Sequence, residues 1–366
     1  MMSDHLNGKL FGTDLFGQAM EPEQKRGALH QRFLIPPFTV LNTREGVWQE
    51  RRRAWLSLGI KSEEGRDGNM LGLKRAMESK EKYDGKAAEQ AAIPAGLTFG
   101  SFKGNISGAK SGTSIFDPVL CECAYRWFCP PGGTVLDPFA GGSVRGVVAA
   151  MMGLQYFGFE LRQEQVAANV AQGDEICAGM PRAPRWFWGD SREMVPRAGA
   201  ADFVFSCPPY ADLEKYSDDP RDLSNMPYDK FLEAYCDIIA AAAAKLLPNR
   251  FAAFVVGEVR DKRGHYRNFV GHTVQAFRRA GMEFYNEAIL VNNAGTMPVR
   301  MNSQFLSGRK MGKLHQNLLV FVKGDPKAAA KACRWPGEVE EVPEQPADVP
   351  ETVQAAAANA EAEEAA

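Results

Sequence analysis

A glycine-rich segment, DPFAGGS at residues 137–143, has the composition of a turn that lies against a ligand. It follows the short apolar run 134–136 and precedes a helical pattern over 144–152. A strand that runs into glycines and then into a helix lets the backbone approach a ligand closely, because glycine carries no Cβ. The segment has neither GxGxxG spacing nor the Lys-Ser/Thr pair of a phosphate loop, which disfavours nicotinamide enzymes and nucleotide hydrolases. The alternative interpretation is a tight turn that binds nothing.

Two acidic residues follow the next two strand-like runs. Glu160 ends YFGFE, where a carboxylate can accept both hydroxyl hydrogens of a ribose, as in dinucleotide sites. Asp190, in WGDS, stands where a side chain can reach an adenine amine. Acidic residues at such positions are also common helix caps, and for Asp190 that alternative is almost equally good.

The segment FSCPPY, residues 205–210, carries the most specific chemistry. Two consecutive prolines remove two backbone donors and stiffen the chain, while their carbonyls stay available as acceptors. Tyr210 adds a flat stacking face. Carbonyl acceptors beside an aromatic ring suit the exocyclic amine of a nucleobase that has been flipped out of its helix. The plain alternative is an aromatic-containing loop without a ligand.

Alternating strand and helix patterns position these segments. Strands are predicted at 134–136, 156–159, 186–188, 202–205, 251–256, 284–291 and 318–323, and helices at 47–58, 116–128, 144–152, 162–177, 228–247 and 269–280. This order indicates an α/β fold with a doubly wound, mostly parallel seven-stranded sheet and ligands at the carboxyl ends of its strands. Only a basic loop, 292–316, separates the last two strands, so the final strand is predicted to be antiparallel.

Composition limits the class of protein. The chain has 366 residues, 43 Lys and Arg, 45 Asp and Glu, and a net charge of −2, which are globular proportions. Residues 325–366 hold ten acidic and three basic residues, so the remainder carries +5 and can accept an anionic partner. Seven scattered cysteines indicate a reducing cytoplasm, and no apolar run has the ~20 residues of a membrane span. The histidines show no metal-ligand spacing, so no metal is predicted.

The chain is predicted to have three regions. Residues 1–104 form an N-terminal extension, partly flexible, with a short extended piece at 38–41 and a weak helix near 76–92. Residues 105–324 form the catalytic domain, whose core is expected to include Trp127, Trp186 and Trp188. Residues 325–366 are acidic and rich in Ala, Glu and Pro, which is typical of a disordered tail.

In their order, DPFAGGS, FGFE, GDS and SCPPY resemble the S-adenosylmethionine-dependent amino-methyltransferases of DNA, which modify adenine N6 or cytosine N4. The resemblance covers residues 105–324 and implies the class I methyltransferase, Rossmann-like fold. Together with PPFTVLNTREGVWQERRRAWLSLGIKSE upstream and VGEVRDKRG downstream, the set is similar to DNA methylases of bacteriophages and prophages. Such enzymes work in the cytoplasm of a bacterial or phage-infected cell, often within restriction–modification.

The resemblance implies a role for each motif. S-adenosylmethionine would contact the glycine turn with its methionine end, Glu160 with its ribose and Asp190 with its adenine, and the segment 113–117 stands in place of the remaining cofactor motif. The implied cofactor residues are Thr113, Ser114, Phe116, Asp137, Pro138, Phe139, Gly141, Gly142, Ser143, Glu160 and Asp190. The implied catalytic residues are Ser206, Cys207, Pro208, Pro209 and Tyr210.

Cys207 departs from the family pattern, in which Asp, Asn or Ser accepts a hydrogen bond from the target amine. A thiol is a weak acceptor, so Ser206 and the Pro208 carbonyl would have to compensate. Another interpretation makes Cys207 a nucleophile for methylating a pyrimidine carbon, which requires an activated thiolate. SCPPY resembles the TSPPY variant associated with cytosine N4, a slight preference over adenine.

Basic residues supply the candidate phosphate contacts. They form three groups: one beside Trp48 and Trp55, one after the fifth predicted strand, and one in the last basic loop, namely Arg51, Arg52 and Arg53; Arg260 and Lys262; and Arg300, Arg309 and Lys310 with Lys313. Each group is equally consistent with an exposed surface whose charges contact only solvent.

The sequence therefore predicts a site-specific methyltransferase that acts on an exocyclic amine of double-stranded DNA, with base flipping. RNA or a protein glutamine is the alternative substrate, since a Pro-Pro-Tyr strand end serves those too. A non-catalytic DNA-binding protein on the same fold is the alternative outside enzymology, and Cys207 is its only hint.

Overall fold

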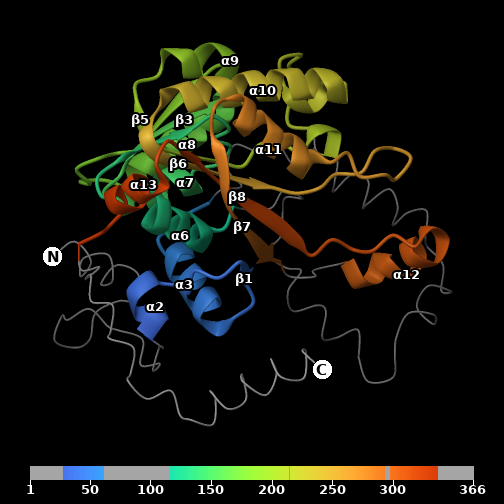
Figure 1. Cartoon of the computed structure of the whole chain (residues 1–366), viewed down its shortest axis with the longest axis horizontal. Helices are drawn as coiled ribbons and strands as arrows, with labels where there is room; N and C mark the ends of the chain where they lie inside the picture. The colour runs from blue at the N-terminus through green and yellow to red at the C-terminus, as the bar shows by residue number, and fades with distance from the viewer. Residues whose placement is uncertain (1–27, 62–115, 214, 293–296, 337–366) are drawn as a thin grey trace, which may run out of the picture. The chain divides into compact units, whose positions relative to one another are not determined.

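The computed structural model describes residues 28–61, 116–213, 215–292 and 297–336 (Figure 1). The chain divides into two compact units, 1–334 and 335–366, and the elements below belong to the first. The predicted weak helix at 76–92 lies outside the described residues, as do Thr113 and Ser114.

A single eight-stranded sheet forms the centre of this unit, in the order β1-β7-β8-β6-β5-β2-β3-β4. Every neighbouring pair is parallel except that β8 runs antiparallel to both β6 and β7. The strands are β1 Val40–Asn42, β2 Thr134–Asp137, β3 Gln155–Glu160, β4 Arg185–Trp188, β5 Ala201–Ser206, β6 Leu246–Val256, β7 Glu283–Val291 and β8 His315–Lys323.

The predicted fold is confirmed. All seven predicted strands are present, the sheet is mostly parallel, and the final strand is antiparallel. The segment predicted as a short extended piece, 38–41, contributes the additional strand β1, in which Leu41 pairs with Leu290 of β7.

Helices cover both faces of the sheet, as a doubly wound fold requires (Figure 1). On one face α10 contacts α9 and α11, while α6 contacts α7 and α3 on the other. The helices are α2 Ala28–Phe33, α3 Gly46–Leu56, α6 Pro118–Phe128, α7 Val144–Met151, α8 Gln163–Ile176, α9 Ser191–Met194, α10 Tyr228–Lys245, α11 Phe269–Arg279, α12 Met297–Gly308 and α13 Pro326–Ala332, with single 3₁₀ turns at Val195–Arg197, Ala211–Leu213 and Leu223–Asn225.

Local signals explain where several helices begin. Asp117 caps α6 by accepting a hydrogen bond from the Val119 amide at 2.9 Å, and Pro118 occupies the first helical position, where its missing donor costs nothing. Asp325 and Pro326 repeat this arrangement at α13. Residues 326–332 are therefore helical, which corrects the prediction of a tail that is disordered from residue 325.

An aromatic cluster between the sheet and helices α10 and α11 forms much of the core. Tyr235 and Phe269 lie 5.3 Å apart between ring centroids, and Phe277 stacks on Phe321 of β8 at 4.0 Å. All four side chains are fully buried. Burying a phenylalanine contributes roughly 1.5–3 kcal/mol, so this cluster fixes α10 and α11 on the sheet.

The α3 helix is anchored to the body by a buried ion pair. The Arg51 guanidinium bonds both carboxylate oxygens of Glu122 on α6, and the Trp55 indole donates to the same carboxylate at 2.7 Å. Arg51 is 5% exposed. The prediction of a phosphate contact from Arg51 is therefore wrong: its side chain points into the protein because Glu122, far away in sequence, neutralises it there.

Two further predictions need correction. The loop predicted at 292–316 contains the helix α12, in which Pro298 falls in the first turn, where proline is tolerated. Trp188, predicted to be in the core, is 52% exposed because β4 is the edge strand.

Within the described ranges, no helix is both long and apolar enough to traverse a membrane.

Candidate functional site

The carboxyl ends of β2, β3 and β5 surround a cavity of about 310 Å³. Gly141 and Pro208 both line it, so the glycine turn and the Pro-Pro-Tyr segment open into one crevice. The predicted residues found on its wall are Phe116, Pro138, Phe139, Gly141, Gly142, Glu160, Asp190, Cys207, Pro208, Pro209 and Tyr210.

Asp137 lies beneath the cavity wall and does not line it. Its carboxylate accepts hydrogen bonds from Ser206 Oγ at 2.5 Å, Tyr156 Oη at 2.7 Å and Arg145 Nε at 2.6 Å, and its side chain is fully buried. Burial alone would lower the pKa of Arg145, but the Asp137 charge raises it above its ordinary value. The predicted cofactor contact of Asp137 is therefore replaced by a supporting role.

Ser143 and Ser206 are also turned away from the cavity. The Ser143 hydroxyl donates to Gln172 Oε1 at 2.7 Å, and Gln172 Oε1 accepts in turn from the Lys61 amide at 3.2 Å. The Ser206 hydroxyl donates to Asp137 and accepts from the Phe139 amide at 3.1 Å. These bonds correct the predicted cofactor role of Ser143 and the predicted acceptor role of Ser206.

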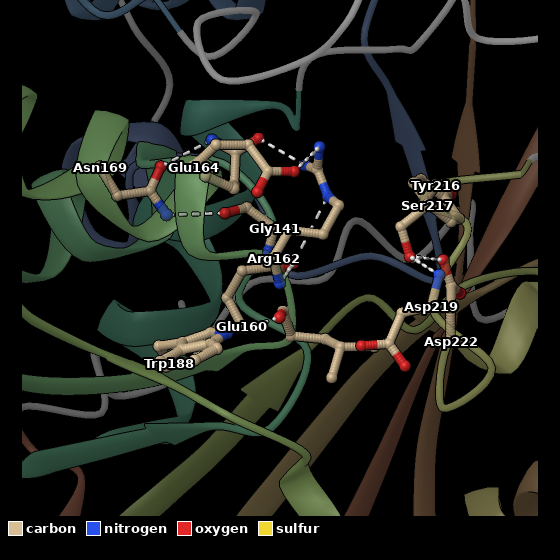
Figure 2. A network of polar contacts seen from close by, with 12 residues as sticks. Gly141, Glu160, Arg162, Glu164, Asn169, Trp188, Tyr216, Ser217, Asp219 and Asp222 are labelled. Atoms are coloured by element: carbon tan, nitrogen blue, oxygen red, sulfur yellow. Dashed lines mark hydrogen bonds and ion pairs between the residues drawn. The ribbon is translucent and has the colours of Figure 1, made fainter.

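The glycine turn has the geometry predicted for close approach to a ligand. Gly141 has φ of +51°, a conformation that favours glycine, and its missing Cβ faces open space. Its amide donates to Glu160 Oε2 at 3.0 Å, and its carbonyl accepts from Asn169 Nδ2 of α8 at 2.7 Å (Figure 2). The turn is thus held on both sides while one edge stays exposed to the cavity.

Glu160 stands at the end of β3 with part of its carboxylate engaged. Oε1 accepts from the Arg162 amide at 3.0 Å, and the Arg162 guanidinium lies 3.6 Å away. Burial raises the pKa of Glu160, more than Arg162 and two backbone donors lower it, and the nearby Asp222 adds to the rise. A carboxylate has about four acceptor positions, so Glu160 retains capacity for hydroxyl donors in the cavity.

A second acidic group faces Glu160 from the loop before α10. Asp222 accepts a hydrogen bond from Ser217 Oγ at 2.9 Å (Figure 2). It also accepts from the Ser224 amide at 2.9 Å. Asp222 is 6% exposed and lines the cavity. Its hydrogen bonds order the loop that closes one side of the crevice.

Asp190 performs the capping role that the sequence left open. Its carboxylate caps α9 by accepting from the Arg192 amide at 2.9 Å, and the Arg192 guanidinium bonds both of its oxygens. Asp190 also lines the cavity. The cap does not test the predicted adenine contact, which stays a prediction.

The Pro-Pro-Tyr segment presents a fixed aromatic ring. Gln316 Nε2 of β8 donates to Tyr210 Oη at 2.6 Å, and Tyr210 Oη lies 3.8 Å from Cys207 Sγ. The Tyr210 ring packs edge-on against Phe269 with a centroid separation of 6.2 Å. Burial raises the pKa of Tyr210 well above its ordinary value, so the hydroxyl stays protonated.

The structure adds residues that the motifs did not reveal. Arg145 donates to the Phe139 and Ala140 carbonyls at 2.6 and 2.9 Å, and its guanidinium lies 4.6 Å from the Phe116 ring centroid. Gln316 orients Tyr210 from a strand far away in sequence. Arg145 follows DPFAGGS by two positions and could have been suspected, but nothing in the sequence marks Gln316.

The remaining basic candidates lie at several places on the fold. Arg52 lies 3.7 Å from Asp117, Arg53 is exposed on α3, and Arg260 donates to the Gly264 carbonyl at 2.8 Å. The other candidates gather near the end of β7 and the loop after β6: Arg309, Lys310 and Lys262 are exposed, and Arg300 belongs to α12.

No family model and no curated protein matches the chain in sequence. Among solved structures it is similar to TrmN from Thermus thermophilus, with 16% identity over 56% of this chain and 48% of TrmN and a TM-score of 0.37. It is also similar to magnesium protoporphyrin IX methyltransferase (ChlM) from Synechocystis PCC 6803 with bound SAM, with 12% identity over 57% of this chain and 76% of ChlM and a TM-score of 0.36.

A candidate DNA modification methylase, also from Thermus thermophilus, is 19% identical over 37% of this chain and 51% of its own length, with a TM-score of 0.28. The similarity therefore spans about half the length of TrmN and of this methylase. Because these superpositions are partial, the assignment of the fold rests on the strand order and direction of the sheet itself.

Proposed function

We propose that the protein is an S-adenosylmethionine-dependent methyltransferase that modifies an exocyclic amine in DNA, at adenine N6 or cytosine N4. The observation that carries the proposal is the shared crevice of Gly141 and Pro208. The turn suited to the methyl donor and the segment suited to the acceptor base leave adjacent parallel strands, β2 and β5, at the same edge of the sheet.

The residues on the donor side fit the cofactor. Gly141 leaves open space where a side chain would block a ligand, Glu160 keeps acceptor positions for the ribose hydroxyls, and Phe116 and Phe139 supply apolar walls. When bound, S-adenosylmethionine supplies an electrophilic methyl group on a sulfonium.

The acceptor side holds a planar base and its amine. Tyr210 is braced by Gln316 and Phe269, so its ring is preorganised for stacking on a base. Among the described residues, no backbone N–H donates to the Pro208 carbonyl, which leaves it able to accept from an amine. Holding the amine there orients its lone pair toward the donor side, and this positioning is the main contribution required of the chain.

A substitution at Cys207 separates amine chemistry from pyrimidine-carbon chemistry. Its sulfur lies 3.8 Å from Tyr210 Oη, and that hydroxyl accepts a hydrogen bond from Gln316 Nε2. If Cys207 only accepts a hydrogen bond, Cys207→Ser preserves or raises the methylation rate, because a hydroxyl is the better acceptor. Complete loss of methylation with intact cofactor binding would support the nucleophilic thiol instead.

The deciding experiment is expression in a methylation-deficient bacterial host, followed by sequencing that detects modified adenine and cytosine. A modified amine at a defined sequence supports the proposal. Methyl transfer from labelled cofactor to RNA or to a protein glutamine, with none to DNA, would replace the substrate. Cofactor binding without transfer to any of the three would support a non-catalytic DNA-binding protein.

A further inference from the structure

The segment between β7 and β8 forms a projecting element, here called the basic arm and defined as residues 297–314. It consists of α12 and a return segment, 309–314, that leads into β8 (Figure 1). In Figure 1 α12 lies away from the helices that cover the sheet. The strand that follows carries Gln316, which bonds Tyr210, so the arm ends beside the acceptor side of the crevice.

The arm is a folded unit. The Arg309 amide donates to the Phe305 carbonyl at 2.8 Å, and the Arg309 guanidinium lies 5.3 Å from the Phe305 ring centroid. The return segment crosses α12 so closely at Gly312 that a Cβ there would overlap the sulfur atoms of Met297 and Met301. These contacts pack the return segment against α12.

Two lysines of the return segment connect the arm to the crevice. The Lys313 ammonium and the Tyr210 ring both lie 3.7 Å from the position that a Cβ on Gly257 would occupy, so they share one neighbourhood. The Lys310 side chain packs against Gly264, in the loop after β6 that also carries Lys262. The arm therefore brings one lysine next to Tyr210 and another next to the loop after β6, in which Asp261 pairs with Arg263.

Charge and apolar exposure combine on this arm. Its sequence contains four basic residues, Arg300, Arg309, Lys310 and Lys313, and no acidic residue. Four large apolar side chains of the arm are exposed: Phe305 is 44% exposed, Leu306 65%, Met311 76% and Leu314 36%. A segment with basic residues and no acidic ones complements the negative charge of a phosphate backbone. Exposed apolar side chains beside it can pack against the bases of a deformed duplex.

We propose that the basic arm is the duplex-binding element of the enzyme. Arg309 and Lys310 contact phosphates next to the target base, and Phe305 and Leu306 pack against the bases that flank its vacated position. The inference rests on the proposed function, because a base held at Tyr210 must come from a duplex that passes close to this arm.

The charge component is tested with Arg309→Gln/Lys310→Gln in the full-length chain. The probe is a fluorescein-labelled DNA duplex of random sequence, and its anisotropy is titrated at several salt concentrations. Each lost phosphate contact lowers the slope of log affinity against log salt by about 0.9, so the double variant is expected to lose about two. Binding of S-adenosylhomocysteine, measured in parallel, is expected to stay unchanged and shows that the variant is folded.

The matched control is Lys327→Gln/Lys331→Gln on α13. Both lysines are exposed, and α13 follows the end of β8 that pairs with the start of β6, at the edge opposite the crevice. This control is expected to keep the wild-type slope. Equal slopes for wild type and the arm variant would overturn the inference, and so would an equal loss in the control.

The apolar component is tested with Phe305→Ala/Leu306→Ala and 2-aminopurine at the target base that sequencing identifies. The variant is expected to lose the fluorescence increase of the extruded base and about ten- to hundredfold in methylation rate, since base contacts of this kind contribute about 1–3 kcal/mol. If the variant keeps the wild-type fluorescence increase, the proposed packing of Phe305 and Leu306 against the flanking bases is rejected. A wild-type dimer that Leu306→Asp dissociates, with DNA binding intact, would assign the surface to a second copy.

Failure of the arm and failure of the proposed function are separable. Wild-type protein that methylates DNA while both arm variants bind and methylate normally would reject the arm alone. Wild-type protein that methylates no DNA would reject the proposed function, and the arm inference with it.

Discussion

Ser206 Oγ donates a 2.5 Å hydrogen bond to Asp137 Oδ1, which joins the last residue of β5 to the last residue of β2. The glycine turn follows Asp137 and the Pro-Pro-Tyr segment follows Ser206. One buried bond therefore fixes the spacing between the two segments that line the crevice. Neither side chain faces the cavity, so both act by positioning.

Ser206→Ala should destabilise the protein more than a comparable serine deletion. A hydrogen bond to a buried charge contributes roughly 1.5–3 kcal/mol, against roughly 0.5–1.5 kcal/mol for a neutral pair. The control is Ser191→Ala, because the Ser191 hydroxyl is also buried but donates to the Pro138 carbonyl at 2.6 Å. Urea unfolding of the two variants measures the difference. Equal losses in the free energy of unfolding would mean that the bond to the Asp137 carboxylate stabilises the fold no more than a bond to a neutral carbonyl.

Arg51→Ala should cost roughly 3–5 kcal/mol in the free energy of unfolding, because it leaves Glu122 charged and buried without its partner. Arg53→Ala, on the exposed side of the same helix, should change it by no more than about 0.5 kcal/mol. Adding Glu122→Gln to the Arg51 variant should recover part of the loss. A large drop in DNA affinity without loss of stability would instead return Arg51 to the DNA-binding surface.

Cofactor affinity should weaken on acidification because of Glu160. Burial raises the pKa of this carboxyl above its ordinary value, so it takes up a proton at a higher pH than an exposed glutamate and then loses acceptor capacity. The raised pKa also means that protonation favours the folded state, so this group does not weaken the fold in acid. Calorimetric titration with S-adenosylhomocysteine from neutral to mildly acidic pH measures the effect.

Glu160→Gln should reduce cofactor affinity about tenfold and flatten that pH dependence. Glu164→Gln is the matched control, because Glu164 lies 3.5 Å from the same Arg162 but has a 61% exposed side chain. It should leave both the affinity and its pH dependence unchanged. A pH profile that Glu160→Gln leaves intact would place the ribose contact elsewhere.

Tyr210→Ala should abolish methyl transfer while sparing cofactor affinity, because the ring faces the acceptor side. Tyr210→Phe keeps the ring and loses the bond from Gln316 and the contact of Oη with Cys207 Sγ, so it should retain most of the activity. Tyr285→Ala serves as the control, since Tyr285 is exposed and contacts Phe251 in the middle of β6. Parallel loss of cofactor affinity and activity in Tyr210→Ala would show that the base pocket has been misplaced.

The sequence alone determined the strands, most helices and the turns that carry the motifs, because these depend on neighbouring residues. The apolar runs before Asp137, Glu160 and Ser206 are local signals, and so are the glycine and double-proline breaks that follow them. The order of these elements was enough to predict that Gly141 and Pro208 meet at one edge of a parallel sheet.

Only the tertiary structure decided which polar side chains face the crevice and which support it. Asp137 and Ser206 bond each other, Arg51 finds Glu122, and Gln316 reaches Tyr210 across more than a hundred positions. A charged or polar residue has the same local pattern whether it meets solvent, a ligand or a distant partner. Burial in the folded protein decides which of these a residue meets. A polar group removed from water must be hydrogen-bonded, and the fold supplies its partner.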